Sequence, residues 1–118
     1  MGTILIVDDE PLVLELAEKL FTAEGYRVFV AGSAQAALAI LNSHEGVDLV
    51  ITDYSMPGTD GAQLAIRIQE NYPKVFVIII SGFGQTLQIN RVSVEMIVDK
   101  PIDFDLLLQK VQKLIGPR

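Results

Sequence analysis

Cysteine and tryptophan are absent from the 118-residue sequence, and histidine occurs only once. Without cysteine the chain can form no disulfide bond, no thiolate metal site and no thiol nucleophile. Basic residues are scarce, 9 against 15 acidic residues, and a net charge of -6 disfavours direct contact with a nucleic acid backbone. The apolar run from Val75 to Ile80 is too short to cross a membrane, and the N-terminus lacks the basic segment of a signal peptide. We therefore expect a cytoplasmic protein that contacts neither membrane nor nucleic acid directly.

The composition is typical of a chain that folds around a core, with 50% hydrophobic and 20% charged residues. The length suits one domain, and no linker, internal repeat or low-complexity segment divides it. We therefore predict a single domain over residues 1–118. No output domain follows the last expected helix, so we expect any output to act through protein contacts or through a parent chain.

Two kinds of segment alternate along the chain. Apolar runs without alternation indicate strands buried on both faces, whereas three- and four-residue spacing of apolar side chains indicates helices. Ser33 and Asp103 are suitable N-caps for two of these helices. The order predicts an α/β fold: a doubly wound, five-stranded parallel sheet with helices on both faces. Strands are expected over 4–7, 28–31, 49–51, 75–80 and 96–98, and helices over 13–21, 33–41, 63–71 and 104–115, with a short or irregular helix over 84–91.

Polar residues follow four of the expected strands. They are Asp8, Asp9 and Glu10 after the first, Asp53 after the third, Ser81 after the fourth, and Lys100 with Pro101 after the fifth. In open α/β sheets, ligands bind outside the carboxyl ends of the strands. If the first and third strands are adjacent, these side chains meet in one pocket, where three carboxylates repel one another. We expect this repulsion to raise their pKa values or to require a cation. Oxygen ligands without histidine or cysteine suit Mg²⁺.

Each residue alone also has an ordinary structural explanation. The acidic residues before Pro11 could cap the first helix, and Asp53 could be a turn residue ahead of Pro57 and Gly58. Ser81 could be a cap or turn hydroxyl, and Lys100 a solvated loop lysine. The functional interpretation depends on finding all of these groups at strand ends of one sheet.

Four segments resemble the receiver domain of two-component response regulators. They are residues 4–10 (ILIVDDE), 53–61 (DYSMPGTDG), 81–82 (SG) and 99–101 (DKP), in order and near the family's spacing. The resemblance covers essentially the whole chain and implies the flavodoxin-like strand order 2-1-3-4-5. It also implies a signalling switch rather than a turnover enzyme.

The resemblance implies a role for each matching residue. Asp53 would take a phosphoryl group from a phosphohistidine of a sensor histidine kinase or histidine phosphotransfer protein. Ser81 and Lys100 would contact phosphoryl oxygens, and the Lys100–Pro101 bond would be cis. These roles agree with general chemistry, because phosphoryl transfer depends on alignment and on neutralising the phosphoryl oxygens.

The resemblance also implies a magnesium site and partner surfaces. Asp9 would bind Mg²⁺ directly and Asp8 through water, with Asp53 and the backbone carbonyl of Ser55 completing the protein ligands. A homodimer is possible, because receivers often use the face of the fourth helix, fifth strand and fifth helix to dimerise.

Two features depart from the family pattern. Ile97 stands where family members usually carry an aromatic switch residue, and the spacing from Ser81 to Lys100 is about three residues shorter than usual. They motivate an alternative, a receiver-like interaction module with weak or phosphorylation-independent output. An aspartate-nucleophile phosphatase fits less well, because its Asp-x-Asp arrangement after the first strand is missing from residues 8–10.

Overall fold

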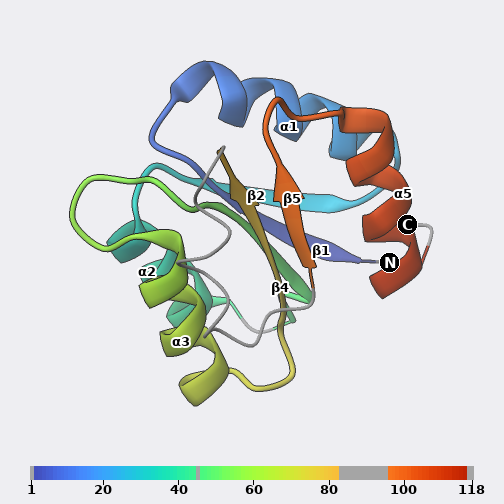
Figure 1. Cartoon of the computed structure of the whole chain (residues 1–118). Helices are drawn as coiled ribbons and strands as arrows, with labels where there is room; N and C mark the ends of the chain where they lie inside the picture. The colour runs from blue at the N-terminus through green and yellow to red at the C-terminus, as the bar shows by residue number, and fades with distance from the viewer. Residues whose placement is uncertain (1, 45, 83–95, 117–118) are drawn as a thin grey trace.

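The five strands form one parallel sheet in the computed structural model, which describes residues 2–44, 46–82 and 96–116 (Figure 1). The strand order is β2-β1-β3-β4-β5, which confirms the predicted order and fold class. The strands extend one or two residues beyond most of the expected runs, so that β3 and β4 include the polar residues predicted to follow them. Their bounds are β1 Thr3–Val7, β2 Arg27–Ala31, β3 Leu49–Asp53, β4 Phe76–Ser81 and β5 Met96–Asp99.

Four helices are described, at the places that the sequence predicts. Ser33 caps the second by accepting a hydrogen bond from the Ala36 N–H, and Asp103 caps the last by accepting one from Leu106. The third begins two residues before the expected start at Gln63, because Asp60 and Gln63 form a reciprocal capping box. The expected helix over 84–91 lies outside the described residues. The helices are α1 Pro11–Ala23, α2 Ala34–Ser43, α3 Gly61–Asn71 and α5 Phe104–Ile115.

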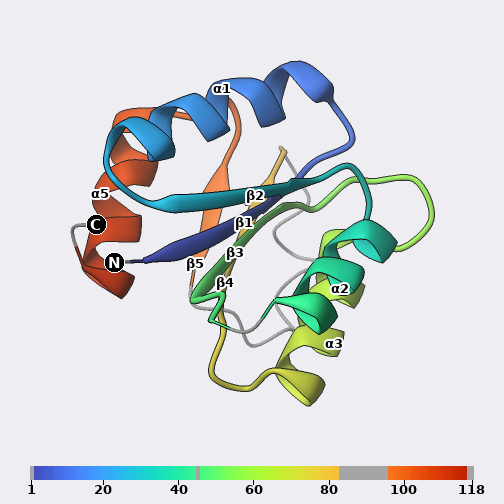
Figure 2. The same ribbon diagram turned by 180° about the vertical axis from the view of Figure 1, so that it is seen from behind.

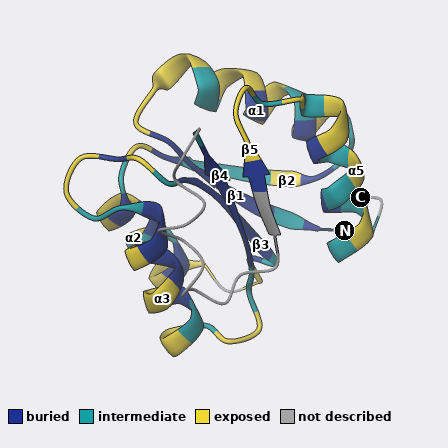
Figure 3. Ribbon diagram, viewed as in Figure 1, coloured by how far each residue is buried: buried dark blue, intermediate teal, exposed yellow. Residues whose placement is uncertain are grey.

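The helices cover both faces of the sheet, α1 with α5 on one and α2 with α3 on the other (Figures 1 and 2). Successive strand residues point to opposite faces, so Leu5 and Val7 pack with α2 and α3 while Ile4 and Ile6 pack with α1 and α5. Figure 3 shows the central strands buried along their length and the outer helix surfaces exposed. This two-sided burial explains why the strand sequences are apolar without alternation.

The parallel arrangement places the carboxyl ends of β1, β3, β4 and β5 at one edge of the sheet. The register pairs Val7 with Thr52 and Ser81 with Asp99. Asp8, which follows Val7, and Asp53, which follows Thr52, therefore lie side by side. Among the described residues, no helix is long and apolar enough to cross a membrane.

Candidate functional site

Three carboxylates meet at this edge of the sheet. Asp8 follows β1, its N–H donating to the Ala31 carbonyl at 3.1 Å, and Asp53 is the last residue of β3. One carboxylate oxygen each of Asp8, Asp9 and Asp53 lies within 4.8 Å of the others. Asp8 and Asp53 are buried and Asp9 is exposed. We call these three carboxylates the acidic site; the sheet brings them together as the sequence predicts.

Lys100 reaches the acidic site from the end of β5. Its backbone N–H donates to the Ser81 carbonyl at 2.8 Å, and its Nζ lies 2.9 Å from Asp53 Oδ1. The lysine side chain is 40% exposed, whereas that of Asp53 is 6% exposed. The Lys100–Pro101 peptide bond is cis, as the family resemblance implies. Lys100 is therefore the partner of the buried Asp53 carboxylate rather than a solvated loop lysine.

The charges of the site perturb two pKa values. Burial raises the pKa of Asp8, and the charges of Asp53 and Asp9 add to this, against the opposing hydrogen bond from the Glu10 N–H and the charge of Lys100. Burial by itself lowers the pKa of Lys100, but its contact with Asp53 and the charges of the acidic site outweigh burial and raise it. The site therefore carries an excess of negative charge that one lysine does not neutralise.

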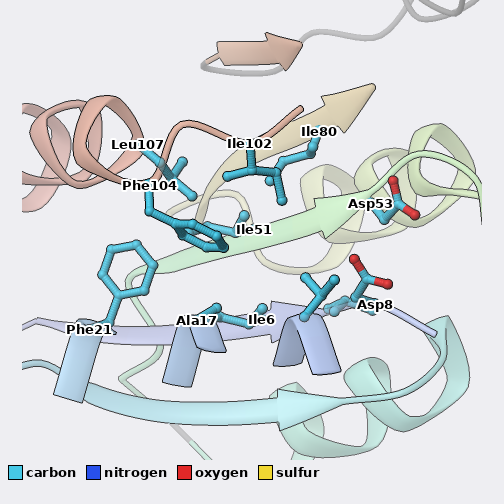
Figure 4. A pocket seen from close by; sticks show the side chains of 12 residues that line it. Ile6, Asp8, Ala17, Phe21, Ile51, Asp53, Ile80, Ile102, Phe104 and Leu107 are labelled. Atoms are coloured by element: carbon cyan, nitrogen blue, oxygen red, sulfur yellow. The ribbon is translucent and has the colours of Figure 1, made fainter. Parts of the chain in front are cut away.

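A small cavity of about 10 Å³ lies under the acidic site, between the sheet and helices α1 and α5. Figure 4 shows the carboxylates of Asp8 and Asp53 at one end of this cavity and the side chains of Phe21 and Leu107 at the other. Its walls are almost entirely apolar. Asp8 and Asp53 thus have hydrocarbon on one side, which explains why burial is the largest influence on the pKa of Asp8.

The capping explanation for the acidic residues does not fit the structure. The N-cap of α1 is Glu10, whose side chain makes no capping hydrogen bond. Asp8 Oδ1 accepts the Glu10 N–H at 2.9 Å, which fixes the carboxylate at the strand end. Asp53 lies within a strand and is not a turn residue. Their positions do not follow from helix capping or turn formation alone.

Ser81 carries a buried hydroxyl without a partner. It is the last residue of β4, its side chain is completely buried, and its Oγ makes no hydrogen bond in the part of the chain that the structure describes. A buried hydroxyl without a hydrogen bond costs about 1–3 kcal/mol. This unpaired donor at the edge that carries the acidic site fits a ligand with acceptor oxygens, such as a phosphoryl group.

Ser55 lies in the loop between β3 and α3, two residues after Asp53, and it is exposed. Its assignment as a backbone carbonyl ligand stays a prediction. Ile97 lies in β5, and its side chain is outside the described part of the structure. His44, the single histidine, follows α2 and stacks on Phe29 with ring centroids 4.6 Å apart, away from the acidic site.

We expect Ser81→Ala to raise the free energy of unfolding by about 1 kcal/mol in the absence of ligands, because it removes the unpaired buried hydroxyl. Ser33→Ala is the matched control and should lower it by about 1 kcal/mol, because Ser33 accepts a capping hydrogen bond at 3.1 Å. Urea unfolding of the two variants measures both effects. If Ser81→Ala lowers the free energy of unfolding as much as Ser33→Ala does, the Ser81 hydroxyl makes a hydrogen bond in the folded chain.

The fold and the site together define a class of protein. The family model of the response regulator receiver domain matches residues 4–112. The chain belongs to this family, whose members are receiver domains of two-component systems.

Two curated relatives differ in length. The transcriptional regulatory protein GlrR of Escherichia coli (strain K12) is 39% identical over 111 residues, covering 92% of this chain and 25% of that protein. Sporulation initiation phosphotransferase F of Bacillus subtilis (strain 168) is 34% identical over 116 residues, covering 95% and 92%. The chain thus spans a quarter of the first relative's length and nearly all of the second's.

A solved structure of similar shape comes from Thermotoga maritima. The response regulator protein TrrA superposes with a TM-score of 0.88 at 33% identity, covering 98% of this chain and 100% of that chain. That protein was crystallised in complex with Mg²⁺ and BeF. The likeness thus extends over the whole sheet and the edge that carries the acidic site.

Proposed function

We propose that the chain is a phosphoacceptor: Asp53 takes a phosphoryl group from a phosphohistidine of a sensor histidine kinase or a histidine phosphotransfer protein. The observation that carries the proposal is the 2.9 Å contact of Lys100 Nζ with the buried Asp53 carboxylate inside a group of three carboxylates. A buried carboxylate held by one lysine is a fixed nucleophile beside a positive charge. The unpaired Ser81 hydroxyl adds a hydrogen-bond donor at the same edge of the sheet.

In the proposed step, a carboxylate oxygen of Asp53 forms a bond to phosphorus while the P–N bond of the phosphohistidine breaks. The electron pair of that bond stays on the ring nitrogen, and with the other ring nitrogen protonated the leaving group is neutral imidazole. Lys100 then pairs with a phosphoryl oxygen, and the Ser81 hydroxyl donates to another. Most of the catalysis is alignment and charge neutralisation, which suits residues fixed at strand ends.

The donor set fits Mg²⁺. Asp8, Asp9 and Asp53 offer carboxylate oxygens close together. Asp9, Asp53 and the Ser55 carbonyl are the proposed direct ligands, and Asp8 would bind the ion through water. Oxygen ligands of this kind are those that Mg²⁺ prefers. When bound, Mg²⁺ would neutralise the excess negative charge of the site and of the incoming phosphoryl group. The complex of TrrA with Mg²⁺ and BeF supports this assignment by likeness.

The proposed role is a switch rather than a turnover enzyme. The phosphoryl group on Asp53 would pull on Ser81 and Lys100 and bias a protein-interaction surface. The alternative, a receiver-like interaction module with weak or phosphorylation-independent output, is less well supported, because the family that the chain matches consists of receiver domains of two-component systems. Homodimerisation, a cytoplasmic location and the lack of direct nucleic acid contact stay predictions.

We expect Mg²⁺ and beryllium fluoride together to stabilise the wild-type chain more than either alone, because the fluoride complex imitates a phosphoryl group on Asp53. At 100 times the dissociation constant, binding adds about 2.7 kcal/mol and raises Tm by roughly 10 °C. Thermal unfolding with Mg²⁺, with beryllium fluoride, with both and with neither measures this. Equal Tm values with Mg²⁺ alone and with both would count against a phosphoryl site at Asp53.

A further inference from the structure

The loop between β3 and α3 is closed by a pair of backbone hydrogen bonds. The Tyr54 N–H donates to the Ile80 carbonyl at 2.8 Å, which ties the end of β3 to β4. The Gly61 N–H donates to the Tyr54 carbonyl at 2.8 Å, which ties the start of α3 back to the residue after Asp53. Both ends of the loop that contains Ser55 therefore lie beside Asp53.

Gly61 leaves no room for a side chain at this closure. A Cβ on Gly61 would lie 2.5 Å from the Asp53 carbonyl oxygen and 2.8 Å from the Tyr54 Cα. Both are backbone atoms, so no side-chain rotation can relieve the contact. The backbone φ of Gly61 is not positive. Glycine is therefore required here for space, and not for an unusual backbone conformation.

The helix cannot easily move away to make room. Asp60 Oδ1 accepts the Gln63 N–H at 2.8 Å and Gln63 Oε1 accepts the Asp60 N–H at 3.0 Å, which fixes the first turn of α3. Leu64, Ala65 and Ile68 bury the inner face of the same helix against the sheet. A side chain at position 61 would therefore displace the peptide between Asp53 and Tyr54.

We propose that Gly61 is a positioning residue of the phosphoacceptor site. By allowing α3 to touch the backbone of Asp53, it fixes the Asp53 carboxylate relative to the following loop and its Ser55 carbonyl. This inference rests on the proposed function, because both groups matter as proposed ligands of Mg²⁺. The sequence shows Gly61 within the family motif but not its role, since the contact becomes visible only once the backbone is in place.

Gly61→Ala is expected to weaken Mg²⁺ binding by about tenfold or more, the effect typical of removing support behind a metal ligand. Gly32→Ala is the first control and should bind Mg²⁺ as the wild type does, because a Cβ on Gly32 meets no atom within 4 Å. Asp60→Ala is the second control, because it destabilises α3 by removing the cap without adding an atom beside Asp53. Calorimetric Mg²⁺ titration of the folded proteins, well below each Tm, separates affinity from stability.

Wild-type Mg²⁺ affinity in Gly61→Ala, or an equal loss in Asp60→Ala, would overturn the inference. NMR tests the positioning role without the metal. The amide chemical shifts of Asp53, Tyr54 and Ser55 should differ from those of the wild type in metal-free Gly61→Ala, and should equal them in Gly32→Ala. If these amide shifts move while the wild type binds no Mg²⁺, the positioning role stands and the proposed function fails.

If Gly61→Ala does not fold, amide hydrogen exchange in the wild type tests whether the Gly61 N–H is held in the closure of the loop. Protection of the Gly61 N–H supports the closure, and exchange at the rate of a free amide refutes it.

Discussion

An Asp53→Asn variant is expected to take up phosphoryl groups from a small donor roughly 10³-fold more slowly than the wild type, or not at all. The amide lacks the charged oxygen that would bond to phosphorus, and it ends the 2.9 Å ion pair with Lys100. Incorporation of a radiolabelled phosphoryl group measures the effect. Asparagine is close in size to aspartate, so the variant should keep the fold and isolate the chemistry.

Asp60→Asn is the matched control for this result. Asp60 lies in the loop after β3 and accepts a capping hydrogen bond, which asparagine can also accept. It is outside the acidic site, so phosphoryl uptake in Asp60→Asn should equal that of the wild type. Full uptake in Asp53→Asn would place the phosphoacceptor elsewhere and remove the basis for the roles of Ser81 and Lys100.

Asp8→Asn should raise the free energy of unfolding in metal-free buffer at neutral pH, by on the order of 1 kcal/mol. Burial and the neighbouring carboxylates disfavour the charged form of Asp8 and raise its pKa. Asparagine removes that charge and retains an oxygen to accept the Glu10 N–H. The same change should weaken Mg²⁺ binding by tenfold or more, because it removes a carboxylate that is proposed to hold the ion through water. Urea unfolding with and without Mg²⁺ measures both effects.

The pH dependence of this stability difference has a definite sign. The pKa of Asp8 is higher in the folded state than its ordinary value of 3.8. The folded chain therefore binds the Asp8 proton more tightly than the unfolded chain does. The contribution of Asp8 to stability is therefore greatest below pH 3.8 and is lost as the pH rises through the folded-state pKa. The free energy of unfolding of Asp8→Asn relative to that of the wild type should increase from pH 3.8 to the folded-state pKa of Asp8. Above that pKa the difference should stay constant to neutral pH. An advantage that shrinks with rising pH would contradict the repulsion within the acidic site.

The apolar runs predict the five-stranded parallel sheet, and the family resemblance supplies its strand order. The two together predict the convergence of Asp8 and Asp53. Apolar runs without alternation identified the five strands, and the carboxyl ends of adjacent parallel strands must share an edge. Ser33 and Asp103 were predictable as caps, because a polar side chain ahead of an apolar helical pattern acts locally.

Features that depend on three-dimensional packing were not predictable from the sequence. The apolar pattern predicts a start of α3 two residues too late, because the first turn of that helix depends on the Asp60–Gln63 box and on the contact of Gly61 with Asp53. The missing hydrogen bond of Ser81 follows from burial, which residue types alone do not determine. The raised pKa of Asp8 is expected from repulsion among the carboxylates, but burial, its largest cause, becomes visible only in the fold. The roles of Ser55 and Ile97 stay predictions.

The most direct test of the phosphoacceptor proposal is the intact mass of the wild-type chain after incubation with acetyl phosphate, in Mg²⁺ and in EDTA. We predict one phosphoryl adduct in Mg²⁺ and none in EDTA, because the excess negative charge of the acidic site opposes an anionic donor unless a cation is bound. No adduct in Mg²⁺, from protein shown to be folded, would contradict a phosphoacceptor site and favour a phosphorylation-independent interaction module.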